Sequence, residues 1–318
     1  EGRLDEAQFL YDSDRAMDDR EKIIFKRLET DDWDLFVAAI ETTDRISHMM
    51  WRLIDPKHPM YDATLASKYG DAIEKVYRRA DDLVGRLRQK VPKDAVFMVM
   101  SDHGFHSFRR EVNLNTWLLQ NGYMTVEDQS QQKSQGQQKT LADLFGRGKF
   151  FEGVDWSQTK AYAVGLGQIY FNLKGREAKG IVSAGEEYRK LQDEIRDKLL
   201  PLKDPETGDR VFQDIYKRDD IYKGEYIQMA PDLQVGFLDG YRVGWQDTLG
   251  TIRRGVVENN NKKWSGDHCA TATEISHGVF FSNRKIASAS PHIMDLAPSI
   301  LKLLEVPVPA DYDGKPLW

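Results

Sequence analysis

Residues 95–105 read AVFMVMSDHGF and decide the predicted fold. The first six are apolar without interruption, which is typical of a strand buried on both faces, as in a parallel sheet. Ser101-Asp102-His103-Gly104 follows at once, so an acid and an imidazole stand where the strand ends. In open parallel α/β sheets, ligands bind just beyond the carboxyl ends of strands. We therefore expect Asp102 and His103 to face a ligand. The alternative is a turn with a capping Asp and a surface His.

A second apolar run, Trp33–Ile40 (WDLFVAAI), predicts another buried strand upstream. Between the two runs, residues 62–90 place apolar side chains at three- and four-residue spacing and predict a long helix. Strand, helix and strand in this order predict a parallel βαβ unit. The predicted fold class is α/β, with a mostly parallel central sheet flanked by helices.

Other parts of the chain complete the predicted architecture. Helices are predicted over residues 15–30, up to residue 52, over 184–200 and over 292–304, and strands over 169–173 and 275–282. Residues 127–140 are rich in Gln and Ser and predict an exposed loop.

We expect two parts. Residues 1–155 and 263–318 form a metal-binding α/β core, and residues 156–262 form an insertion or cap region with substrate contacts. The cap carries four aromatic side chains that could stack on a substrate or fill its core: Tyr162, Tyr170, Tyr241 and Trp245.

Composition narrows the function classes. The 318 residues are 40% apolar and 30% charged, as in an ordinary soluble globular protein. A net charge of -6 argues against bulk nucleic-acid binding, although a local cation could still attract a small phosphate. The single cysteine excludes an intramolecular disulfide, and no apolar run is long enough to span a membrane. The compartment is unknown, and we expect any signal peptide to lie upstream of Glu1.

Asp44 and His48 repeat the pairing of a carboxylate with an imidazole. They follow the run Trp33–Ile40, and at positions i and i+4 of a helical turn they face the same side. Hard oxygen and imidazole nitrogen are both ligands of zinc and similar ions. The alternative is an N-capping Asp beside an incidental, partly buried His.

A third motif, Trp264-Ser265-Gly266-Asp267-His268, would add another imidazole through His268. Asp267 is expected to orient the loop, or to orient a metal ligand without touching the ion itself. The competitor for His268 is His277, inside the predicted strand. His106 could contact substrate, because it lies close to His103 in the sequence. The remaining two histidines, His58 and His292, are interpreted as structural or surface residues.

Together these residues carry a family resemblance. The ordered motifs are ETTDRISH (41–48), SDHGF (101–105), SGDH (265–268) and GVFFSNRKI (278–286), with VNLNTWL at 112–118 and MDLAPSILKLLEVPVPADYDGKPL at 294–317. The set resembles the alkaline phosphatase superfamily, closest to its type I phosphodiesterase/nucleotide pyrophosphatase branch.

The resemblance implies an alkaline-phosphatase-like, metal-dependent phosphoric ester hydrolase with two divalent ions, zinc or alternatively manganese. Asp44, His48 and His268 would hold one ion, and Asp102 and His103 would help to hold the other. The implied substrate is a small phosphate ester, such as a nucleotide or another phosphodiester.

The resemblance also implies a Thr or Ser nucleophile on an earlier segment. Thr42, Thr43 and Ser101 lie near the ligands but do not match its position. We therefore expect the nucleophile upstream of Glu1, with this chain as the carboxyl-terminal portion. The parent protein would be the enzyme, and the chain alone would hold one ion and be poorly active. Alternatives are a phosphoglycerate mutase-like or phosphomonoesterase activity in the parent, or a non-catalytic metal-stabilised binding domain.

Overall fold

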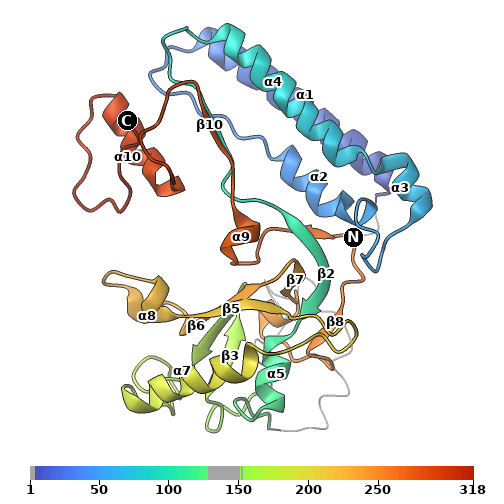
Figure 1. The fold of residues 1–318 in the computed structure, drawn as a ribbon, viewed down its shortest axis with the longest axis vertical. Coiled ribbons are helices and arrows are strands. Elements are labelled where there is room, and N and C mark those ends of the chain that lie inside the picture. The colour runs from blue at the N-terminus through green and yellow to red at the C-terminus, as the bar shows by residue number, and fades with distance from the viewer. Residues whose placement is uncertain (1–3, 128–150, 152) are drawn as a thin grey trace. The chain divides into compact units, whose positions relative to one another are not determined.

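The computed structural model describes residues 4–127, 151 and 153–318 (Figure 1). The chain divides into two compact units. The first unit comprises residues 1–54, 63–104 and 277–318, and the second comprises residues 55–62 and 105–276. The loop predicted over residues 127–140 lies outside the described residues from 128 onward. No helix in the described part of the chain is long and apolar enough to cross a membrane.

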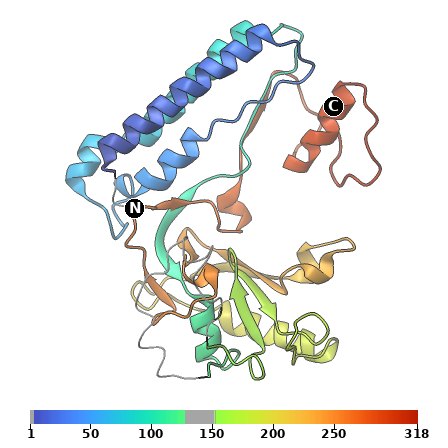
Figure 2. The same cartoon turned by 180° about the vertical axis from the view of Figure 1, so that it is seen from behind.

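Two long helices, α1 (Glu6–Thr30) and α4 (Ala72–Lys90), lie side by side in the first unit (Figures 1 and 2). α1 begins where the Asp5 side chain accepts a hydrogen bond from the Gln8 amide, at 2.8 Å. Met17 of α1 and Leu83 of α4 belong to one buried apolar cluster, which also includes residues of α2 (Thr42–Met50). This cluster therefore fixes α2, the helix that carries Asp44 and His48.

The long helix predicted over residues 62–90 is interrupted. It forms α3 (Ala63–Tyr69) and α4, with Gly70 between them. A Cβ atom on Gly70 would lie 2.5 Å from the Ala66 carbonyl oxygen, so the turn requires glycine. The helix predicted up to residue 52 is confirmed as α2 followed by the 3-10 turn η1 (Trp51–Leu53).

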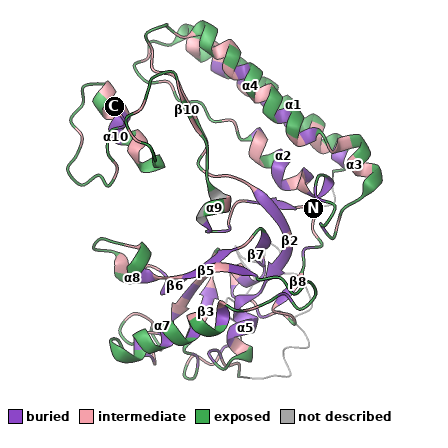
Figure 3. Cartoon of the chain, in the orientation of Figure 1, coloured by how far each residue is buried: buried purple, intermediate pink, exposed green. Residues whose placement is uncertain are grey.

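The predicted parallel βαβ unit is wrong. Residues 33–40 form no strand, and Leu35 and Val37 are exposed. The second run is strand only at β1 (Met98–Met100), which pairs antiparallel with β10 (Phe280–Ser282). An apolar run becomes a strand only if another strand satisfies its backbone groups. No described strand pairs with residues 33–40, so this run stays unpaired, and its residues are exposed or half-buried (Figure 3).

The carboxyl-terminal part of the first unit also differs in detail. The strand predicted over residues 275–282 divides into the short helix α9 (Thr273–Ser276), which belongs to the second unit, and β10. The helix predicted over residues 292–304 is confirmed as the 3-10 turn η5 (Ile293–Asp295) followed by α10 (Leu296–Leu303).

The second unit contains two four-stranded sheets among its described residues. In the first, β2 (His106–Val112) pairs in parallel with β7 (Gly240–Val243) and antiparallel with β8 (Val257–Asn259) and β9 (Gly266–Asp267). The other has the order β3 (Ala161–Val164), β4 (Gln168–Phe171), β6 (Leu233–Phe237) and β5 (Phe212–Lys217), and every pair is antiparallel. The mostly parallel sheet is therefore wrong, although the mixed α/β class holds.

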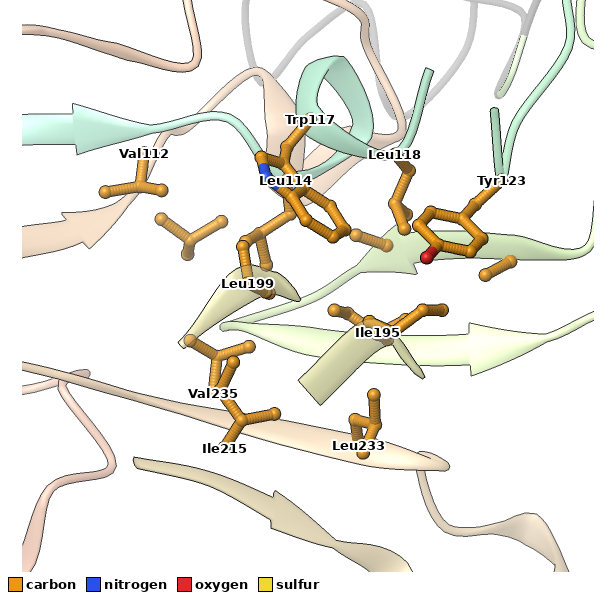
Figure 4. Packing of buried hydrophobic residues seen from close by; sticks show 14 of the residues in the cluster. Val112, Leu114, Trp117, Leu118, Tyr123, Ile195, Leu199, Ile215, Leu233 and Val235 are labelled. Atoms are coloured by element: carbon orange, nitrogen blue, oxygen red, sulfur yellow. The ribbon is translucent and has the colours of Figure 1, made fainter. Parts of the chain in front are cut away.

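A large apolar core holds the second unit together. Leu114, Trp117 and Leu118 of α5 (Leu114–Gln120) pack with Ile195 and Leu199 of α7 (Glu186–Leu199) over the strands (Figure 4). The predicted helix over 184–200 is thus confirmed as α7, and the predicted strand over 169–173 as β4. The remaining short elements here are α8 (Arg218–Ile221), η3 (Ile227–Met229) and η4 (Asp247–Leu249).

Asp247, at the start of η4, is a fully buried acid in this core. Its Oδ1 accepts a hydrogen bond from the Asn115 amide at 2.8 Å, and within the described residues its Oδ2 has no hydrogen-bond partner. Burial raises the pKa of Asp247 to about 8. The folded chain therefore keeps this proton at neutral pH, whereas the unfolded chain releases it near its ordinary pKa of about 4.

This difference predicts a pH-dependent effect of Asp247→Asn. Stability linked to the proton is complete below about pH 4 and is lost progressively as the pH rises to about 8. We expect the variant to unfold several degrees above the parent chain at about pH 7.5, with the gap closing toward about pH 4.5. Thermal unfolding followed by circular dichroism across this range tests it, with the exposed-site variant Asp209→Asn as control. An Asp247→Asn effect that does not change with pH would contradict the assignment.

Candidate metal-binding site

Asp44 and His48 meet on one face of α2. The His48 Nε2 atom lies 3.3 Å from the Asp44 Oδ1 atom, as the i,i+4 spacing predicts. His48 is buried, whereas the Asp44 side chain is 38% exposed. The residue at the N-cap of α2 is Glu41, so Asp44 does not act as the capping residue.

Asp102 and His103 follow β1, as predicted for a strand-end loop. The His103 Nδ1 atom lies 2.9 Å from the Gly104 carbonyl oxygen, and a carbonyl can only accept a hydrogen bond. The proton of a neutral ring is thereby assigned to Nδ1, which leaves the lone pair on Nε2. This Nε2 lies 3.5 Å from the Asp102 Oδ1 atom.

The first unit also brings Asp44 and His103 together. Each offers a ligand atom, and these atoms lie within 4.8 Å of one another. The sequence motifs assign the two residues to different ions, whereas in the structure Asp44 lies near both His48 and His103. One carboxylate oxygen and imidazole nitrogens at this separation fit the donor chemistry of zinc and of manganese.

Hydroxyl groups close to these ligands have other roles. The Ser101 Oγ atom accepts a hydrogen bond from the Val279 amide at 2.9 Å, which ties the β1 loop to the segment before β10. Gly278 is needed there, because a Cβ atom would lie 2.5 Å from the Ser101 carbonyl oxygen. Thr43 donates to the Ile40 carbonyl oxygen at 3.3 Å, and Thr42 is buried. None of the three is therefore presented as a free nucleophile.

His268 lies in the second unit, directly after β9. Its ring packs against Phe105, with the ring centres 5.6 Å apart. Its Nδ1 atom lies 3.8 Å from the Cys269 sulfur. Burial raises the pKa of the Cys269 thiol to about 12, so near neutral pH the group beside His268 is a thiol and not a thiolate.

Asp267 is buried and bonded on both carboxylate oxygens. Its Oδ1 accepts hydrogen bonds from the amides of His268 and Cys269, each at 2.9 Å. Its Oδ2 accepts one from the Trp264 Nε1 atom at 2.8 Å and lies 3.0 Å from the Arg242 Nε atom. Although burial opposes ionisation, the Arg242 charge and these donors hold the pKa of Asp267 well below its ordinary value.

Arg242 is a residue that the sequence motifs did not identify. It is fully buried on β7, where its guanidinium donates to the Val243 carbonyl oxygen at 2.9 Å. It also lies over the rings of Trp245 and Phe108, 4.1 Å and 5.2 Å from their centres. The sequence feature that could have pointed to Arg242 was a single arginine in an otherwise weakly polar stretch, YRVGW.

The other histidines lie in different surroundings. His106 is buried, its Nδ1 lies 2.8 Å from the Ser107 carbonyl oxygen, and burial lowers its pKa. His277 is exposed, and His292 lies at the N-cap of η5. His58 is buried, with Nε2 2.9 Å from the Phe108 carbonyl oxygen and Nδ1 accepting from the Met60 amide. His58 and His292 therefore have structural surroundings.

The four aromatic side chains predicted for the cap region lie in three different surroundings. The rings of Tyr162 and Tyr170 stack with their centres 5.7 Å apart, and Tyr162 donates to Glu177 at 3.2 Å. Tyr241 is buried and donates to Asp204 at 3.2 Å, which makes it part of the core. Trp245 packs edge-on against Trp264, with the ring centres 5.5 Å apart.

The sequence profile of the family "Type I phosphodiesterase / nucleotide pyrophosphatase" matches residues 2–268. The matched region contains Asp44, His48, Asp102, His103 and His268. The chain belongs to this family, which is a family of enzymes, and the predicted resemblance is confirmed. A search of curated proteins gave no match.

The geometry of the first unit predicts that zinc binding depends on its imidazoles. We expect His48→Ala and His103→Ala each to weaken zinc binding by at least about 10-fold, because each removes a ligand atom close to Asp44. His292→Ala, at the exposed N-cap of η5, is the matched control and should bind like the parent chain. Competition with a chromophoric chelator measures the affinities. Unchanged affinity in His48→Ala and His103→Ala would rule out these ligands.

Proposed function

We propose that the chain supplies the metal-ligand part of a phosphodiesterase. Asp44, His48 and His268 hold one divalent ion, and Asp102 and His103 contribute to a second. The observation that carries the proposal is the approach of Asp44 to imidazoles from two separate segments, in a chain whose family consists of phosphodiesterases and pyrophosphatases.

We propose zinc as the ion, with manganese as the alternative, since imidazole and carboxylate ligands suit both. Such an ion supplies Lewis-acid stabilisation of phosphoryl oxygens. The role of the chain itself is to hold the ligands in place. α2 fixes the buried His48 ring, and the hydrogen bond of Nδ1 to Gly104 orients His103.

The substrate that this site suits is a small phosphodiester, such as a nucleotide. Bound divalent ions would attract its phosphate despite the net charge of -6.

A second candidate role is metal binding without hydrolysis by this chain alone. This role is favoured because the hydroxyl groups of Thr43 and Ser101 form hydrogen bonds with backbone groups, and Thr42 is buried. A phosphodiesterase that uses a hydroxyl nucleophile needs that group next to the ion. In this role none of Thr42, Thr43 and Ser101 is the nucleophile.

The two roles predict different rates for the 318-residue chain. If the chain binds metal without hydrolysis, then zinc-loaded parent chain and His48→Ala should cleave bis-p-nitrophenyl phosphate at the same background rate. The release of p-nitrophenolate measures this. A parent rate far above that of His48→Ala would instead show that these 318 residues contain a complete active site.

The third ligand is tested by replacing each of the two competing histidines with alanine in turn. His268→Ala should weaken zinc binding by at least about 10-fold, because it removes one imidazole of the proposed set. His277→Ala is the matched control, since His277 is exposed and lies outside that set. Isothermal titration with zinc distinguishes the two variants. Loss of affinity in His277→Ala alone would assign the third imidazole to His277.

A further inference from the structure

The backbone around His268 has little regular structure to hold it. β9 consists of Gly266 and Asp267 alone, and their partners on β2 are Ser107 and His106. A ladder of two residues constrains the next residue less than a longer ladder does, because fewer backbone hydrogen bonds hold the strand. His268 nevertheless has to present its imidazole in one direction if it is to bind an ion.

The Asp267 carboxylate adds a constraint on both sides of β9. It accepts hydrogen bonds from the amides of His268 and Cys269 on one side of the loop and from the Trp264 indole on the other. One side chain thus connects the residues before β9 to the residues after it. All of its hydrogen bonds go to the segment that carries His268.

Arg242 holds that carboxylate from the interior. Both members of the Arg242–Asp267 ion pair are 1% exposed, and their Nε and Oδ2 atoms are 3.0 Å apart. The guanidinium cannot move easily, because it packs over the rings of Trp245 and Phe108 and donates to the Val243 carbonyl oxygen. The carboxylate is thus held in a fixed place.

Stability alone gives no reason for such a pair. Two charges removed from water seldom stabilise a fold more than well-packed apolar side chains of the same size. A buried pair whose carboxylate accepts its hydrogen bonds from one loop is better explained by the position of that loop.

We propose that Asp267 and Arg242 are positioning residues for His268, an inference that rests on the proposed function. Their ion pair fixes the His268 backbone before an ion binds. Trp245 and Phe108 hold the guanidinium, and Trp264 holds the second carboxylate oxygen. Residues that orient metal ligands in this way typically change metal affinity by about 10- to 100-fold when they are replaced.

The test replaces both charges together, because Asp267→Leu alone would leave Arg242 buried and unpaired. The variant is Asp267→Leu with Arg242→Met. The matched control is Asp204→Leu with Arg110→Met, which removes another buried ion pair of the second unit, 2.7 Å between its Nε and Oδ2 atoms. Thermal unfolding, zinc affinity and amide hydrogen exchange at His268 and Cys269 are measured for both.

We expect the Asp267/Arg242 double variant to fold, to bind zinc about 10- to 100-fold more weakly and to exchange the two amides at least about 10-fold faster. The Asp204/Arg110 control should keep the parent zinc affinity and exchange rates. Parent-like affinity and exchange in the Asp267/Arg242 variant would overturn the proposal, and so would equal losses in the control pair.

His268→Ala separates this proposal from the one on which it rests. If that variant binds zinc like the parent chain, the ligand assignment fails, and hydrogen exchange alone then decides whether Asp267 anchors the loop. If it weakens binding while the Asp267/Arg242 variant does not, the ligand assignment stands and the positioning role is wrong.

Discussion

The contact between Asp44 and His48 on a single turn of α2 is the interaction on which the candidate site depends. It places a carboxylate oxygen 3.3 Å from the nitrogen of a buried imidazole. The apolar cluster around Met17 and Leu83 fixes α2 and therefore this pair. His103 arrives from a different segment, yet its ligand atom lies within 4.8 Å of that of Asp44. A donor set that is already assembled loses little conformational entropy when an ion binds.

The proposed ligands are held by contacts to their backbone or with neighbouring backbone groups. His103 is oriented by the Gly104 carbonyl oxygen, and the His268 amide is bound by Asp267. In each case a fixed polar group next to the ligand limits the direction of the ring or of its backbone. The buried charge of Asp267 is in turn balanced by Arg242. The site therefore depends on residues that would not themselves touch an ion.

Local sequence patterns predicted local structure well. Helical spacing identified α1, α2 and α7, and the apolar stretch around Ile169 became β4. The spacing of Asp44 and His48 predicted their contact. The parallel sheet was wrong, because which strands pair depends on residues far apart in the chain. Residues 33–40 have the composition of a buried strand but no described strand beside them. Arg242 could not be assigned either, because only the pairing of β2 with both β7 and β9 links it to Asp267.

The central claim is that imidazole and carboxylate groups of this chain bind a divalent ion. X-ray absorption at the zinc edge, on the 318-residue chain with one equivalent of zinc, tests it most directly. The account predicts nitrogen and oxygen neighbours at about 2.0 to 2.2 Å, with the outer-shell scattering typical of imidazole rings. A spectrum without imidazole scattering, or with a sulfur neighbour at about 2.3 Å from Cys269, would contradict it.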